Sequence, residues 1–246
     1  MKFLIALLLP LSGPVLQAWL AILMVRRRVA KDFPLFFAYT IFAVLAELLK
    51  FAVRRNFHVY LALFYVTQPI YALLGFLAIA EVFYNVFKSF YRIWWFQFLL
   101  PGMGVLMVGF SVLIAVLRPP IGANRFVATV FVFEIIVRCL QLAVFFLIFG
   151  LAQFYDLFWR QYSFGIASGF GIAAFGILTT VVARSVFGTR YASTLQYLPS
   201  VTYLIAVLIW LAAFFRPLPP DPLSDVRPLL TPDLLRELYE RYRRFR

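Results

Sequence analysis

Seven long apolar runs, separated by short polar or basic segments, dominate this chain. They cover residues 3–25, 34–53, 58–86, 93–117, 126–154, 163–187 and 193–215. Each is long enough to cross the hydrocarbon core of a bilayer, which takes about 20 helical residues. The runs lack the alternation of period two that lipid-facing strands show. Because a backbone in lipid must satisfy its own hydrogen bonds, the pattern predicts an all-α, polytopic bundle of seven transmembrane helices.

Composition agrees with a chain that is dissolved in lipid. Of its 246 residues 64% are hydrophobic and 13% are charged, and the mean hydropathy is +0.92. Soluble domains are about half apolar and about a quarter charged. An aqueous fold of this length would leave a large apolar exterior, so the composition predicts a membrane protein.

The formal net charge of +13 is explained by membrane topology rather than by nucleic-acid binding. Basic residues gather at the ends of the apolar runs, where they orient helices and anchor them to headgroups. No basic face carries aromatic residues spaced to stack bases, so we expect no nucleic-acid partner. The triple arginine at residues 26–28 follows the first run and places its end in the cytoplasm. The N-terminus is therefore predicted outside and the C-terminus in the cytoplasm.

Residues 216–246 differ from the predicted bundle of residues 1–215. A proline-rich linker is followed by a short sequence with leucines on one face and arginines around it. This pattern predicts an amphipathic helix on the anionic lipids of the inner leaflet, and a frayed, solvated terminus is the alternative. The membrane-surface residues would be Arg236, Arg241, Arg243, Arg244 and Arg246.

Ionisable and amide side chains within the apolar runs are the candidates for function, since such groups are costly in hydrocarbon. If the polar helix faces converge, they form a cavity that faces outward. Alternatively, Glu47–Lys50 and Glu134–Arg138 neutralise each other within their own helices, and Lys50 extends to the interface. The candidate lining consists of Glu47, Lys50, Gln68, Glu134, Arg138 and Gln141.

Two further sets of residues point to structure. Glu81 lies near the inner end of the third run, where a tie to Lys88, to Arg92 or to the triple arginine is expected. In the sixth run, Gly165, Gly169 and Ala173 recur every four residues, a spacing that allows close helix packing.

Missing residue types exclude several chemistries. The chain has one histidine, His58, and one cysteine, Cys139, so bis-histidine haem ligation and zinc or iron–sulfur sites are excluded. The sequence contains neither GxSxG nor HExxH. We therefore predict no metal and no cofactor.

The stretches RRRVAKDFPLFFAYT and EVFYNVFKSFYR resemble a family of uncharacterised bacterial seven-helix inner-membrane proteins, over about the first hundred residues. The resemblance implies an inner-membrane location and assigns no site residues. Seven helices with the N-terminus outside also match the 3+1+3 plan of SWEET-type sugar transporters, although the polar faces at Glu47 and Arg138 do not repeat between the triplets.

These observations favour a non-enzymatic membrane protein, either a sensor or an accessory subunit that binds lipid or other membrane subunits through its helices and tail. The alternative is a small-solute transporter with the 3+1+3 plan and a polar cavity near Glu134 and Arg138. An intramembrane enzyme, with acid–base chemistry at Glu134 or Glu81, ranks third.

Overall fold

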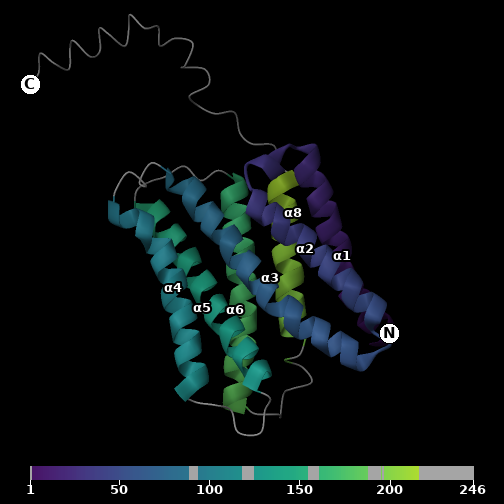
Figure 1. The fold of residues 1–246 in the computed structure, drawn as a ribbon. Helices are drawn as coiled ribbons and strands as arrows, with labels where there is room; N and C mark the ends of the chain where they lie inside the picture. The colour runs from purple at the N-terminus through teal and green to yellow at the C-terminus, as the bar shows by residue number, and fades with distance from the viewer. Residues whose placement is uncertain are drawn as a thin grey trace, which may run out of the picture. The chain divides into compact units, whose positions relative to one another are not determined.

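The computed structural model describes residues 2–88, 94–117, 125–154, 161–187, 195 and 197–215, and within these it is all-helical. The predicted seven long helices are confirmed there (Figure 1). Their bounds lie within about two residues of those predicted, except that the last helix begins five residues later. The elements are α1 (Lys2–Arg26), a short 3-10 helix η1 (Val29–Lys31), α2 (Pro34–Val53), α3 (Phe57–Val86), α4 (Trp94–Leu117), α5 (Arg125–Phe154), α6 (Gln161–Phe187) and α8 (Leu198–Phe215).

Five segments among the described residues are long and apolar enough to cross a membrane, which indicates a multi-pass membrane protein. The other two helices, α1 and α4, have 25 and 24 residues. The qualifying segments are Pro34–Val53, Phe57–Val86, Thr129–Phe154, Tyr162–Arg184 and Leu198–Phe215.

Six helices pack in a closed ring, and one lies outside it. Around the ring, α1 contacts α2, α2 contacts α3, α3 contacts α5, α5 contacts α6, α6 contacts α8, and α8 returns to α1. α4 packs chiefly against α5 at the edge of the bundle (Figure 1). Because α4 carries the chain back across the bundle, the triplets α1–α2–α3 and α5–α6–α8 run in the same directions. Each triplet supplies half of the ring.

The close packing of α6 against α8 depends on three glycines, Gly165, Gly169 and Gly176, the last of which lies against Thr202. A methyl group at Gly165 would overlap Ala213, and one at Gly169 would overlap the Trp210 ring. The Trp210 indole instead lies over α6, and its Nε1 donates to the Ile166 carbonyl at 3.2 Å. Two of the three predicted packing residues therefore lie in this contact. The third, Ala173, is buried one turn further along α6.

Glu81 binds backbone N–H groups at the start of α2. Its two carboxylate oxygens accept hydrogen bonds from the N–H groups of Leu35 and Phe36, at 3.1 and 3.0 Å. These are first-turn donors of α2, which have no partner within the helix. No ion pair joins Glu81 to Lys88 among the described residues, and Arg92 lies outside them. Glu81 therefore acts as a helix cap, because first-turn amides satisfy a carboxylate as a cation would, and its tie to Arg92 stays a prediction.

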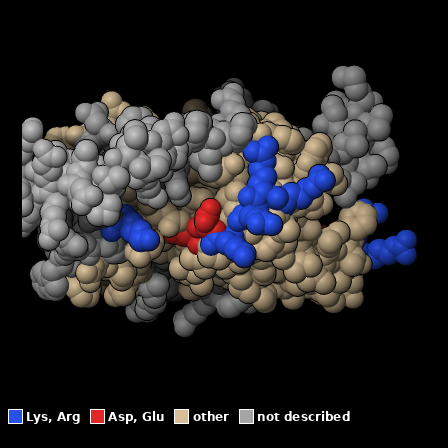
Figure 2. Space-filling model, turned by 90° about the horizontal axis from the view of Figure 1, so that it is seen from above, with Lys and Arg blue, Asp and Glu red and all other residues tan. Residues whose placement is uncertain are grey.

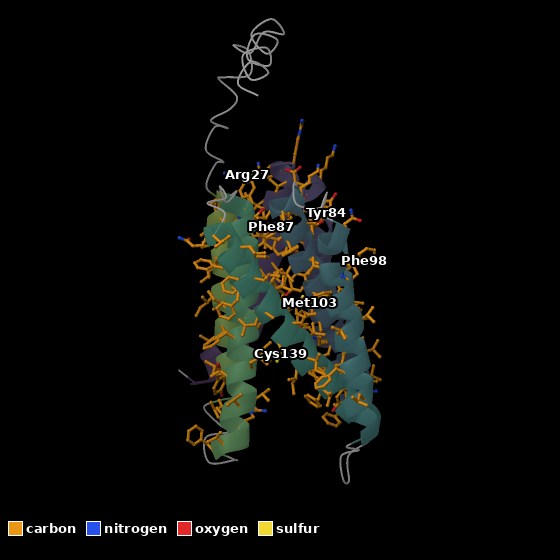
Figure 3. The ribbon with its side chains drawn as sticks, turned by 90° about the vertical axis from the view of Figure 1, so that its left-hand side faces the viewer. Arg27, Tyr84, Phe87, Phe98, Met103 and Cys139 are labelled. Atoms are coloured by element: carbon orange, nitrogen blue, oxygen red, sulfur yellow. The ribbon has the colours of Figure 1, made fainter. Side chains whose placement is uncertain are left out.

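Exposed cations gather where α1, α3 and α8 end, beside the start of α2, and we call this the basic end. Arg27, directly after α1, links α1 to α8 at this end, because its Nη2 donates to the Phe215 carbonyl in the last turn of α8 at 2.8 Å. Arg27 lies at the same end as Tyr84 and Phe87 (Figure 3). Figure 2 shows the blue side chains over this face. The exposed cations of the basic end are Arg26, Arg27, Arg28, Lys31 and Lys88.

Candidate functional site

A cavity of about 750 Å³ lies inside the ring and is lined by all six ring helices. The lining residues come from the N-terminal to middle parts of α1, α3, α5 and α8 and from the C-terminal parts of α2 and α6. In an up-and-down ring these parts lie at the end opposite the basic end. The polar lining residues are Ser12, Gln17, Glu47, Lys50, Thr67, Gln68, Tyr71, Glu134, Arg138, Tyr197, Ser200 and Tyr203.

The cavity reaches the surface beside the start of α8. Tyr197, just before this helix, is 50% exposed, and Ser200 in its first turn is also exposed. Deeper in the cavity, Arg138 is only 3% exposed. Its neighbour Cys139 lies about halfway along the bundle in Figure 3. The site therefore extends from an open rim to the middle of the bundle.

The structure brings five of the six predicted cavity residues to one lining. Gln141 is the exception, because it is fully buried behind Arg138 and does not line the cavity. It holds the guanidinium in place, since its Oε1 accepts from Arg138 Nη1 at 3.0 Å. The residues that do line the cavity are Glu47, Lys50, Gln68, Glu134 and Arg138.

Arg138 is held by few partners for a buried cation. Its Nη2 lies 3.7 Å from Glu134 Oε1, which is an ion-pair distance but too long for a hydrogen bond. Gln68 Nε2 donates to the same oxygen at 3.2 Å. The Tyr71 ring lies below the guanidinium, 6.0 Å from its carbon. Nε of Arg138 has no hydrogen-bond partner among the described residues.

The second pair of charges lies within α2. Lys50 Nζ donates to Glu47 Oε1, and the Lys50 and Glu47 side chains are 12% and 44% exposed. The ammonium also lies 5.8 Å from the centre of the Phe64 ring. Both acid–base pairs thus form within their own helices and also line one cavity, so the two interpretations of these residues are compatible.

A chain of hydrogen-bonded hydroxyls crosses the inner part of the cavity. Tyr39 Oη donates to Tyr71 Oη at 2.6 Å, and Tyr71 Oη donates to Tyr203 Oη at 2.6 Å. The Gln17 amide nitrogen donates to Tyr203 Oη. This tyrosine chain joins α2, α3, α8 and α1, and so connects the two helix triplets.

Between the tyrosine chain and the basic end, aromatic rings fill the ring of helices. Phe36 lies 5.2 Å from Trp210 and Phe170 lies 5.1 Å from Trp210, measured between ring centres. Tyr39 lies 5.0 Å from Phe170, and Phe36 stacks on Phe214 at 6.0 Å. All five side chains are at most 1% exposed. This aromatic cluster separates the cavity from the basic end.

Several polar residues of the site were not predicted, among them Gln17, Tyr39 and Tyr203, which form the tyrosine chain with Tyr71. Gln17 carried a usable signal, because an amide within an apolar run needs a partner in lipid. The tyrosines carried none, since 13 tyrosines are spread through the chain.

Among the described residues, no group of three histidine, cysteine, aspartate or glutamate side chains could hold a metal ion. No family model matches the chain, and no curated protein or solved structure gives a significant match.

Proposed function

We propose that this protein binds a small polar solute in the cavity and carries it across the membrane. The observation that carries the proposal is the convergence of two acid–base pairs, one of them buried, on one cavity within an apolar helix ring. Ionisable groups that face a cavity within a membrane mark substrate pathways. The volume of about 750 Å³ also lies within the range of small-molecule sites.

The order of the helices supports transport. Transporters with parallel repeats place their substrate site near the membrane middle, between the repeats. Here the two triplets enclose the cavity, and α4 is the connector that gives both triplets the same direction. Arg138 of the second triplet lies close to Tyr71 of the first. The solute would therefore bind between the two halves.

In the part of the chain that the structure describes, the cavity has one exposed rim, and this supports transport by alternating access. The rim at Tyr197 and Ser200 is exposed, whereas the aromatic cluster and the bond from Arg27 to the Phe215 carbonyl close the basic end. A transporter needs a closed end that can open as the other closes. The tyrosine chain joins the triplets and is the element whose bonds would rearrange.

We infer that the basic end faces the cytoplasm of a bacterial inner membrane, where its cations contact anionic lipids. Cysteines that replace Gly122 or Gly188, in a Cys139→Ser background, are then labelled by an impermeant maleimide from outside. A cysteine that replaces Ser224 is protected in intact cells. Labelling at position 224 would reverse the orientation.

Cysteine accessibility tests whether the cavity is a water-filled binding site. In the Cys139→Ser background we compare Ser200→Cys at the rim and Ile177→Cys in the wall with Leu106→Cys on α4. Leu106 is 74% exposed in the isolated chain but faces lipid if α4 crosses the membrane. A charged thiosulfonate should modify the two cavity positions and spare position 106. If Ile177→Cys is as unreactive as Leu106→Cys, the cavity is dry and the proposal fails.

A membrane-subunit function is the second candidate, and α4 is the observation that favours it. This helix packs chiefly on α5, and Val105 and Leu106 are each 74% exposed. If a partner subunit covers this face, native electrophoresis of mild-detergent extracts shows a complex that Leu106→Trp dissociates. A single species that this substitution leaves unchanged argues for a lipid-covered α4.

A further inference from the structure

The guanidinium of Arg138 has a buried edge whose N–H donors lack hydrogen-bond partners among the described residues. Of its five N–H donors, only Nη1 has a hydrogen-bond partner among the described residues, Gln141. Nε has none there, and Nη2 is 3.7 Å from Glu134. Nε and Nη2 form one edge of the guanidinium, and their parallel N–H groups match the two oxygens of a carboxylate.

Burial makes the unpaired donors costly. The Arg138 side chain is only 4% exposed, and the cavity is the route by which acceptors can reach it. Buried donors are nearly always hydrogen-bonded, and an orphan on a charged group is especially unfavourable. A ligand that brings two acceptor oxygens to Arg138 would remove that cost.

The other charges decide what else the ligand carries. Two acids and two bases line the cavity, so the lining is neutral overall. A carboxylate on Arg138 would take the partner of Glu134, while Lys50 is already bound to Glu47. Glu134 would then be an uncompensated anion beside a second anion. Both of its contacts use Oε1, and Oε2 has no hydrogen-bond partner among the described residues.

We propose that the cavity binds a small zwitterion of the amino-acid type. Its carboxylate binds the Nε and Nη2 edge of Arg138, and its ammonium group binds Glu134. In an α-amino acid these two groups are adjacent, which suits a guanidinium and a carboxylate that lie 3.7 Å apart. The remaining volume, walled partly by Phe64 and Tyr71, accepts the side chain. This inference rests on the proposed function and specifies the class of solute.

The test uses the full chain, purified in detergent, and begins with wild-type protein. Calorimetry and thermal unfolding identify the tightest binder among the twenty common amino acids, with glucose as the neutral comparison. The same amino acid without its carboxylate, and then without its ammonium group, is measured next. Each of the two analogues should bind at least tenfold more weakly. No substitution is needed at this step, so misfolding of a variant cannot obscure the result.

Variants then assign the two contacts. Arg138→Lys keeps the charge but loses the planar edge, and should weaken amino-acid binding at least tenfold. Glu134→Gln should weaken the amino acid more than its deaminated acid and so reduce the preference between them. Glu81→Gln is the matched control, because Glu81 is an acid outside the cavity lining that binds the first turn of α2, and it should change affinity less than threefold.

The possible failures are distinguishable. Binding of glucose alone, or equal binding of the amino acid and its deaminated acid, refutes the zwitterion and leaves a solute-binding cavity in place. Unchanged amino-acid binding in Arg138→Lys also refutes the assigned site. If no solute binds and Ile177→Cys is unreactive, both the zwitterion and the proposed function fail.

Discussion

Substituting Glu134 and Arg138 by glutamine, singly and together, measures how the buried charges are held. Each single substitution leaves one charge without its partner in a low-dielectric setting, and the double substitution removes both. A broken buried pair typically destabilises by about 3–5 kcal/mol, whereas removing both charges is often nearly neutral. The two losses should therefore not add.

The magnitude follows from the geometry. At the 3.7 Å that separates Arg138 Nη2 from Glu134 Oε1, two unit charges attract by about 4 kcal/mol at an effective dielectric constant of about 20. Glu134 is 13% exposed and keeps its bond from Gln68, so Arg138→Gln should fall at the lower end of the range. Glu134→Gln should destabilise by an amount nearer the upper end of the range, because the Arg138 side chain that it leaves unpaired is more deeply buried.

Thermal unfolding in detergent is the assay. At about 2–4 °C per kcal/mol, each single substitution should lower the Tm by roughly 6 °C or more, and the double variant should recover most of that loss. The pair Glu47 and Lys50 is the matched control. Because Glu47 is 44% exposed, its coupling to Lys50 should stay below about 1 kcal/mol. Additive losses at Glu134 and Arg138 would show that the two charges are independent and would refute this reasoning.

Three further predictions concern other parts of the fold. Gly169→Ala should destabilise by about 1–3 kcal/mol because its methyl group meets Trp210, while Gly102→Ala, with no atom nearby, should be neutral in the same unfolding assay. Glu81→Ala should cost about 0.5–2 kcal/mol by removing the cap of α2, and an unchanged Tm would show that the cap is dispensable. Removing residues 229–246 should leave an inserted, monodisperse bundle by size-exclusion chromatography, because the helices satisfy their own backbones; aggregation would contradict this.

The helices could be predicted from sequence because bilayer thickness sets both their length and their polarity. The start of α8 shows where this pattern fails. The apolar run begins at residue 193, but Pro199 is the second residue of a helix that starts at Leu198. Proline lacks the backbone N–H that donates to the preceding turn inside a helix. In the first turn this N–H has no acceptor within the helix, so proline is tolerated there. The apolar run therefore predicted the hydrophobic segment correctly, but its first residue did not predict where the helix begins.

Part of the site could be predicted because charge is rare in lipid. Glu134 and Arg138 are conspicuous in an apolar helix, and their spacing of four residues places them on one face. The tyrosine chain could not be predicted, since Tyr39, Tyr71 and Tyr203 look like ordinary apolar side chains until the ring is closed. Tertiary contact alone brings their hydroxyls together.

The partner of Glu81 could not be predicted for a different reason. A carboxylate near several cations suggests an ion pair, but backbone amides of a distant helix leave no mark in the sequence. Glu81 lies 45 and 46 positions from the two N–H groups that it binds. Only the packing of α2 against α3 shows which of the competing partners it takes.

Transport in proteoliposomes tests the central claim most directly. Vesicles that contain the purified chain are loaded with a mixture of unlabelled amino acids and glucose, and the entry of tritiated amino acids or tritiated glucose is followed. We predict saturable counterflow of at least one of these solutes with wild-type protein. Flux should fall to that of protein-free vesicles with Arg138→Gln, and Glu81→Gln, outside the cavity lining, should retain it. Wild-type flux no greater than that of protein-free vesicles, for every solute in the mixture, would contradict the account.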